Sequence, residues 1–214
     1  MTSVIDRSSS EYNVLFRNTI LQCQEEEKVY LRDIQGFQRI ADDTFIFKEI
    51  SFLNLSKTAL PTAYLFKPPL PWDELTEEEK CMTHWIEKSH HGIEWDSGDI
   101  PYHRLHKILE ICTQGVTKLF VKGKQKAEWI KNLLPDLSIT NVENFGCPSF
   151  EKIIYDKQFV CFNHDLCIRR VPMCAVRNVI AIRTWLLDYL DDRFSLDTVD
   201  NQNSKCICLY WKSA

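Results

Sequence analysis

The sequence lacks any apolar run that approaches the roughly 20 residues needed for a membrane-spanning helix. Its first residues, MTSVIDRSSSEYN, also lack the apolar segment of a secretory signal. Nine cysteines are present, an odd count. Without a secretory signal, clustered cysteine and histidine residues more often bind metal than form disulfides. We therefore expect reduced thiols, a cytoplasmic or nuclear location and no membrane partner.

Several catalytic signatures are also missing. The chain has no P-loop, no G-x-S-x-G nucleophile elbow and no dinucleotide-binding glycine fingerprint, so no small-molecule cofactor is expected. We find no internal repeat and no low-complexity segment. The net charge of −4 is too mild for a histone-like nucleic-acid binder, although a local basic face remains compatible with it. With 44% hydrophobic residues in 214, the chain can form one sizeable core.

Changes of hydrophobic period along the chain predict its elements. Five strands are predicted, at Val29–Phe37, Thr44–Leu55, Ala63–Lys67, Thr117–Val121 and Ser138–Val142. Helices are predicted at Trp72–Lys88, capped by Asp73 or Thr76, and at Tyr102–Cys112, Lys122–Leu134 and Met173–Leu190. A short helix at Tyr12–Gln24 and a strand-like run at Gln158–Phe162 complete the pattern.

The order of these elements predicts the fold class. Three hairpin-linked strands, a strand–helix crossover and a closing helix indicate an α/β domain with a mixed sheet flanked by helices. Ribonuclease H-like folds, which include DEDD exonucleases, share this order. We expect a leader and short helix over residues 1–28, a single ribonuclease H-like domain over 29–194 and a tail over 195–214.

An exonuclease of that fold binds two divalent ions through carboxylates. The first strand should present an Asp-x-Glu pair, but here it reads Asp33-Ile34-Gln35. An amide is a weaker ligand for a hard cation than a carboxylate. The strand–helix unit should add an aspartate, and instead it carries lysines. We therefore expect no two-metal exonuclease, while an active nuclease using Asp33, Glu49 and Asp165 remains an alternative.

A cluster of cysteine and histidine precedes the closing helix. Cys161 and His164 are spaced C-x2-H, and Cys174 lies at the predicted start of the helix. This pattern is typical of a zinc half-site, and Cys167 is a rival local ligand. Buried apolar thiols are the alternative interpretation.

Glu49 lies in the middle of the second predicted strand, within FKEISF. Because side chains alternate along a strand, Glu49 is expected on the same face as Phe47. A carboxylate on a buried face is costly unless it is paired or bound to metal. The alternative is an exposed sheet face on which Lys48 and Glu49 are ordinary surface residues.

Three segments, KEISFLNL, LFVKGKQKAEWIKNLL and CFNH…CAVRNVIAIRTWL, resemble successive parts of the Maelstrom domain. The resemblance covers roughly residues 30–190. That family has a ribonuclease H-like fold without the exonuclease carboxylates and with a Glu-Cys-His-Cys zinc site. The resemblance implies that Glu49, Cys161, His164 and Cys174 bind Zn²⁺. It also implies a setting in small-RNA (piRNA) pathways and transposon silencing, with silencing-pathway proteins as partners and weak, metal-independent cleavage of single-stranded RNA.

Basic residues suggest where RNA would bind. Those predicted to contact single-stranded RNA are Lys122, Lys124, Lys126, Arg169, Arg170 and Arg177. A solvated helix face is the alternative for these side chains. The leading hypothesis is a zinc-stabilised RNA-binding module, and a protein-interaction scaffold of the same fold is the second.

Five histidines between residues 84 and 106 suggest a second metal or acid–base site, or an exposed polar loop.

Overall fold

The computed structural model describes residues 29–55, 59–153 and 174–200. It contains a five-stranded mixed sheet with the strand order β3-β2-β1-β4-β5. The strands are β1 (Val29–Gln38), β2 (Phe45–Asn54), β3 (Thr62–Leu65), β4 (Lys118–Val121) and β5 (Ser138–Asn141). The pairs β1–β2 and β2–β3 are antiparallel, whereas β1–β4 and β4–β5 are parallel. The predicted mixed sheet and its five strands are thus confirmed.

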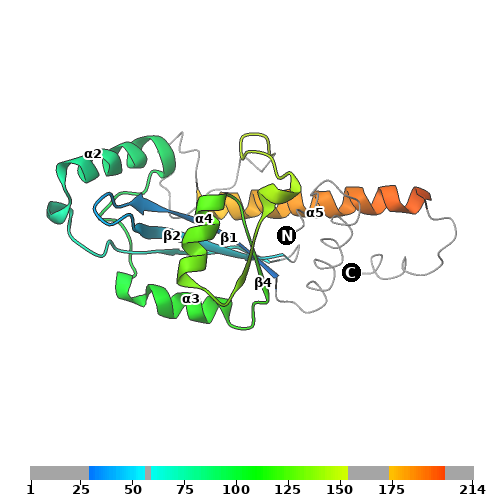
Figure 1. Cartoon of the computed structure of the whole chain (residues 1–214), viewed down its shortest axis with the longest axis horizontal. Helices are drawn as coiled ribbons and strands as arrows, with labels where there is room; N and C mark the ends of the chain where they lie inside the picture. Colours follow the sequence, from blue (N-terminus) through cyan, green and yellow to red (C-terminus); the bar gives the residue numbers. More distant parts are fainter. Residues whose placement is uncertain (1–28, 56–58, 154–173, 201–214) are drawn as a thin grey trace, which may run out of the picture.

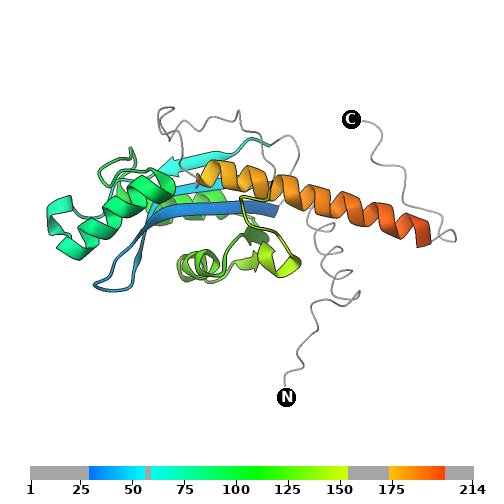
Figure 2. The ribbon, with the colours of Figure 1, turned by 90° about the horizontal axis from the view of Figure 1, so that it is seen from above.

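Helices cover both faces of this sheet (Figures 1 and 2). They are α2 (Glu77–Ile86), α3 (Leu105–Thr113), α4 (Lys124–Leu133) and α5 (Ala175–Asp200). The helices α3 and α4 lie on one face and α5 lies on the other, while α2 lies beside the end of the β1–β2 hairpin. No helix within the described ranges combines the length and apolar character that a membrane crossing requires.

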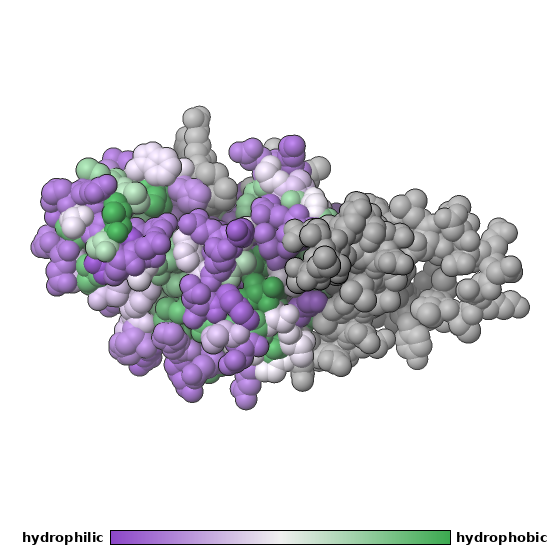
Figure 3. Space-filling view, in the orientation of Figure 1, coloured by the Kyte–Doolittle hydropathy of each residue, from purple (hydrophilic) through white to green (hydrophobic). Residues whose placement is uncertain are grey.

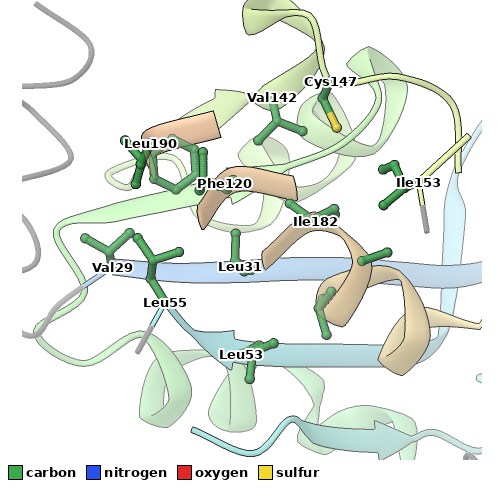
Figure 4. Close-up of a cluster of buried hydrophobic side chains, with 13 residues drawn as sticks. Val29, Leu31, Leu53, Leu55, Phe120, Val142, Cys147, Ile153, Ile182 and Leu190 are labelled. Carbon is green, nitrogen blue, oxygen red and sulfur yellow. The ribbon is translucent and has the colours of Figure 1, made fainter. Parts of the chain in front are cut away.

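Each face has its own apolar core. On the α5 face, Leu31, Leu53 and Phe120 from the strands pack with Ile182 and Leu186 (Figure 4). Positions 179, 182, 186 and 190 of α5 are all buried in this core, and their spacing forms one apolar stripe of a helix. On the other face, the core includes Ile34, Ile50, Leu109, Leu119 and Ile130.

Two predicted helix boundaries differ from the structure. The helix expected at Trp72–Lys88 is divided, because a 3₁₀ turn (Trp72–Glu74) is followed by Leu75 in an extended conformation. The α-helix begins after Thr76, whose hydroxyl accepts a hydrogen bond from the Glu79 N–H at 3.2 Å in a capping box. At the other end of the chain, α5 continues to Asp200, past the helix end predicted at Leu190 and past the domain boundary predicted at residue 194.

Candidate functional site

Asp33 lies on β1, on the face covered by α5, and its carboxylate is completely buried. Three side chains donate to it. Lys126 Nζ lies 2.7 Å from Oδ1, while Gln35 Nε2 and Asn178 Nδ2 lie 2.9 Å and 2.7 Å from Oδ2. A buried carboxylate is tolerated when its charge is paired and its lone pairs are used. Asp33 meets both conditions, because Lys126 pairs its charge and Gln35 and Asn178 donate to its other oxygen.

The position of Lys126 follows from the crossover between β4 and β5. Strand β4 pairs with the first half of β1 and ends at Val121, opposite Arg32. Gly123, with φ of +103°, then turns the chain into α4. The first turn of α4 therefore lies over the carboxyl end of β4, from which the ammonium group of Lys126 reaches Asp33. This is where the nuclease hypothesis requires a second carboxylate, and a cation is present instead.

Asn178 brings the beginning of α5 to the same carboxylate. It is 1% exposed, and its Oδ1 has no hydrogen-bond partner among the described residues. The sequence analysis did not single out Asn178. Asn178 follows Cys174 by four residues, and this spacing places both residues on one face of a helix. The spacing is the feature of the sequence from which the position of Asn178 near the site could have been inferred.

The arrangement around Asp33 is chemically unsuited to a hard divalent cation. Such an ion needs several oxygen lone pairs, whereas Lys126, Gln35 and Asn178 direct donors at the only carboxylate of this group. Nowhere in the described ranges do three or more histidine, cysteine or acidic residues gather as a metal site would require. Asp165, the third residue of the nuclease alternative, lies outside the described residues.

Glu49 is also fully buried, and its carboxylate accepts a hydrogen bond from the backbone N–H of Ala175 at 2.9 Å. Ala175 is the first residue of α5. Backbone N–H groups at a helix N-terminus have no partner within the helix and carry partial positive charge. The carboxylate of Glu49 thus satisfies one of these groups with favourable electrostatics. The exposed-surface alternative for Lys48 and Glu49 is wrong, since both are 0% exposed.

Cys174 precedes α5 directly and lies at the same helix terminus. It is buried, and its Sγ accepts a hydrogen bond from the Arg177 N–H at 3.5 Å. The structure therefore brings two of the four predicted zinc ligands, Glu49 and Cys174, to one helix N-terminus. The other two, Cys161 and His164, and the rival Cys167 lie outside the described residues.

The expectation that Phe47 and Glu49 share a face is wrong. A β-bulge between Gln35 and Gly36 pairs Gln35 with Glu49 and Gly36 with Phe47, so Lys48 is the extra residue of β2. Phe47 packs in the α3 and α4 core, while Glu49 points to α5. The inserted Lys48 is buried, and its ammonium donates to the carbonyl groups of Trp95 and Ser97 at 2.5 and 2.6 Å.

The basic residues predicted to contact RNA have different surroundings. Lys122 is buried and forms an ion pair with Glu143 at 2.7 Å, whereas the side chain of Lys124 is 87% exposed. Arg177 is half-buried on the first turn of α5, and its backbone N–H donates to Cys174 Sγ. Arg169 and Arg170 lie outside the described residues.

The histidines between residues 84 and 106 do not gather at one place. His103 and His106 are exposed, and so is His84, whose Nδ1 lies 3.6 Å from a carboxylate oxygen of the partly buried Glu87. His91 is fully buried, so the expected loop of exposed histidines is only partly present. The Nε2 of His91 lies 3.1 Å from the Gly36 carbonyl oxygen, and its Nδ1 accepts from the Ile93 N–H at 3.0 Å. We assign this side chain a structural role at the β-bulge.

His90 lies at the edge of the group around Asp33. Burial lowers the pKa of His90, and the positive charge of Lys126 lowers it further, while Asp33 acts in the opposite direction. A neutral imidazole is therefore favoured next to the ion pair. Together, His90, Lys124 and Lys126 give the outer rim of this site a polar and basic character.

The fold and this site define an α/β domain with a buried, neutralised carboxylate at the junction of β1, α4 and α5. Neither protein-family models nor curated proteins match the chain.

Proposed function

We propose that this protein is a divergent ribonuclease H-like domain that binds single-stranded RNA without two-metal hydrolysis and is stabilised by zinc. The observation that carries the proposal is the neutralised carboxylate of Asp33. The ion pair with Lys126, at 2.7 Å, gives the centre no net negative charge with which to concentrate Mg²⁺ or Mn²⁺. The strand order with its β4–α4–β5 crossover supports the ribonuclease H-like fold.

The zinc part of the proposal is supported by the donors that meet at the start of α5. Glu49 supplies a carboxylate and Cys174 a thiol, and both belong to the donor types that zinc accepts. Cys161 and His164 would complete four positions, which leaves no open position for a reactive water molecule. The bound ion would hold β2 to α5 and would have a structural role.

The RNA part is supported by the rim of the site. Lys124 is exposed, Lys126 is 20% exposed, and both are on the first turn of α4. On the face seen in Figure 3, hydrophobic residues form separate patches among hydrophilic ones. This surface suits a polar, charged ligand better than a large apolar partner. Together with the resemblance to the Maelstrom domain, it supports a setting in small-RNA silencing.

Elemental analysis of the purified chain tests the zinc. We expect one equivalent of zinc in the wild type and a loss of most of it in Glu49→Gln and Cys174→Ser. Cys81→Ser is the matched control, because Cys81 is exposed on α2 and lies outside the predicted ligand set. Absence of zinc from a folded wild-type chain would overturn this part of the proposal.

Fluorescence anisotropy with labelled single-stranded RNA tests the binding. We expect salt-sensitive binding that weakens in Lys124→Ala and in Arg169→Ala/Arg170→Ala. Lys107→Ala is the control, because the side chain of this lysine is also exposed, 72% against 87% for Lys124, but lies on α3. Zinc without RNA binding would indicate the scaffold. RNA cleavage that EDTA abolishes and Mn²⁺ restores would indicate the active nuclease.

A further inference from the structure

A pocket of about 440 Å³ opens between the segment that follows β3 and the segment that leads into α3. Its lining residues are Lys67, Pro68, Pro69, Pro101, Tyr102 and His103. None of them belongs to the group around Asp33. The volume is within the range of roughly 300–1,000 Å³ that is typical of sites for small organic molecules, so the pocket has room for more than a single anionic group.

Backbone and side-chain contacts hold the two walls of this pocket in place. Phe66 and Ile100 form a parallel β-bridge, and the N–H of Lys67 donates to the Ile100 carbonyl at 2.8 Å. The hydroxyl of Tyr102 accepts a hydrogen bond from the Phe47 N–H at 3.2 Å, and its ring contacts Phe66 edge-on, with centroids 6.4 Å apart. The prolines on both sides restrict the backbone further. The pocket is therefore preformed, and a ligand need not order it.

The charges of both walls have the same sign. Lys67 is the only charged residue of the segment 59–72, and the segment 101–109 carries two basic residues and two histidines but no acidic residue. Lys67, His103 and Arg104 are exposed, and none of the ion pairs between described residues includes them. The start of a helix normally favours acidic side chains, and the first turn of α3 has none. An anion in the pocket would supply the missing negative charge.

We propose that this pocket binds a nucleotide, with its phosphate at Lys67 and His103 and its base against Tyr102 and the prolines. A lysine ammonium binds phosphate as a point charge, and an imidazole N–H can donate a hydrogen bond to it. The anchored ring of Tyr102 and the apolar proline rings offer a surface on which a planar base can stack. A simple anion or an apolar molecule would use only one half of this lining.

The strand directions place the pocket along the same edge of the sheet as Lys124 and Lys126. Strands β1, β3 and β4 run in one direction, because β2 is antiparallel to β1 and β3, and β4 is parallel to β1. Ligands of open α/β sheets bind at the carboxyl ends of such strands. Three strand spacings, roughly 14 Å, separate β3 from β4.

Two sources supply the chemistry that this pocket would recognise. One is a free mononucleotide. The other is the phosphorylated end of an RNA strand that continues to the lysines on α4, and this source rests on the RNA binding proposed above. The nucleotide site itself does not depend on that proposal, because its lining residues and those on α4 are different.

Isothermal titration calorimetry with adenosine 5′-monophosphate (AMP) tests the pocket. We expect saturable binding that is about tenfold tighter than the binding of adenosine or of ribose 5-phosphate, because each of these lacks one of the two contacts. AMP that does not bind, or that binds no more tightly than either fragment, would overturn the proposal. Tighter binding of phosphotyrosine than of AMP would assign the pocket to a phosphorylated protein and would overturn it as well.

Lys67→Ala and His103→Ala test the phosphate contact. Both side chains are exposed, so we expect folded proteins that bind AMP about tenfold and several-fold more weakly, respectively, with unchanged binding of adenosine. Lys88→Ala is the matched control, because this exposed lysine follows α2 and does not line the pocket. An AMP affinity that is unchanged in both pocket variants, or that falls equally in the control, would contradict the site.

RNA oligonucleotides with a phosphate at the 5′ end, at the 3′ end or at neither end distinguish the two sources. If an RNA strand supplies the nucleotide, one terminal phosphate tightens binding about tenfold, and Lys67→Ala removes this gain. If the ligand is a free mononucleotide, AMP binds and terminal phosphates have no effect. RNA that fails to bind while AMP binds would overturn the RNA-binding proposal alone. RNA that binds while AMP fails would overturn the nucleotide pocket alone.

Discussion

The side-chain amide of Asn178 donates a hydrogen bond to Asp33 at 2.7 Å and so joins β1 to α5 across 145 positions of the sequence. Lys126 reaches the same carboxylate from α4. The elements β1, α4 and α5 are thus connected at Asp33 by an ion pair and hydrogen bonds. In this chain the group formed by Asp33, Lys126, Gln35 and Asn178 contributes to the stability of the fold.

Replacement of Lys126 tests this stabilising role. In Lys126→Met, Asp33 keeps its two amide donors but loses its counter-charge in a fully buried position. Breaking a buried ion pair by removing one partner costs about 3–5 kcal/mol. Since the Lys126 side chain is 20% exposed, we expect the lower end of that range in the free energy of unfolding, measured by urea denaturation.

Lys124→Met is the matched control for this measurement. Lys124 precedes Lys126 by two positions on the same helix, and its side chain is 87% exposed beside Glu128. An exposed pair of this kind contributes at most about 0.5 kcal/mol. Equal destabilisation by the two variants would show that the Asp33–Lys126 pair has no special importance.

The β-bulge that turns Glu49 towards α5 gives a second prediction. A Cβ atom at Gly36 would lie 1.9 Å from the Ile46 carbonyl oxygen, so the backbone of the hairpin would have to shift. We expect Gly36→Ala to lower the free energy of unfolding by roughly 3 kcal/mol or more. Thermal or urea unfolding measures the effect. A shift of the bulge would also move Glu49 away from the Ala175 N–H, so zinc content is a second measurement.

Gly146→Ala serves as the comparison. Gly146, unlike Gly36, has a positive φ, +85°, but nothing lies within 4 Å of a Cβ atom built there. Only the backbone conformation opposes the new side chain, and such a change costs about 1 kcal/mol. A larger effect at Gly146 than at Gly36 would contradict the importance of the close contact in the bulge.

The sequence predicts the strands well because the hydrophobic period changes clearly at each boundary. It does not reveal the bulge, which depends on how β1 and β2 pair, and so it gives the wrong face for Phe47 relative to Glu49. The lysines at the start of α4, where the nuclease hypothesis expects an aspartate, are visible in the sequence. The ion pair between Lys126 and Asp33, however, joins residues 93 positions apart and depends on how α4 and β1 meet in the fold. Arg32 reads as an ordinary strand residue, and only tertiary packing reveals its burial.

The buried Lys48 predicts a dependence of stability on pH. Burial lowers its pKa to about 8, and the charges of Asp96 and Glu87 only partly oppose this. Between about pH 8 and pH 10 the unfolded chain holds a proton on Lys48 that the folded chain releases. Raising the pH through this window should therefore stabilise the wild type relative to Lys48→Met, by about 2–3 kcal/mol at most.

Unfolding free energies of the two proteins at a series of pH values measure this difference. All other titrating groups, including the cysteines and tyrosines, are common to both proteins and cancel in the comparison. Below pH 8 the difference should be constant. A difference that stays constant up to pH 10 would show that folding leaves the pKa of Lys48 unchanged.

A double variant tests whether Lys126 and Asn178 disfavour metal binding at Asp33. In Lys126→Ala/Asn178→Asp, a second carboxylate replaces the amide that lies 2.7 Å from Asp33, and the competing cation is gone. Two adjacent buried carboxylates repel each other, so this variant should be less stable than the wild type without metal. Bound Mn²⁺ would relieve the repulsion and raise the melting temperature by several degrees at saturating concentration.

Calorimetry or thermal unfolding with and without Mn²⁺ measures this gain, with Mg²⁺ as a second ion. Lys124→Ala/Asn144→Asp is the control, because it makes the same change of net charge at two exposed positions that are not among the donors to Asp33. Only the variant at residues 126 and 178 should respond to the ion, because only there do two carboxylates converge from β1 and α5. An equal rise of the melting temperature in the control would show that the change of net charge alone causes the effect. Replacing Lys126 and Asn178 would then be insufficient to create a metal site around Asp33.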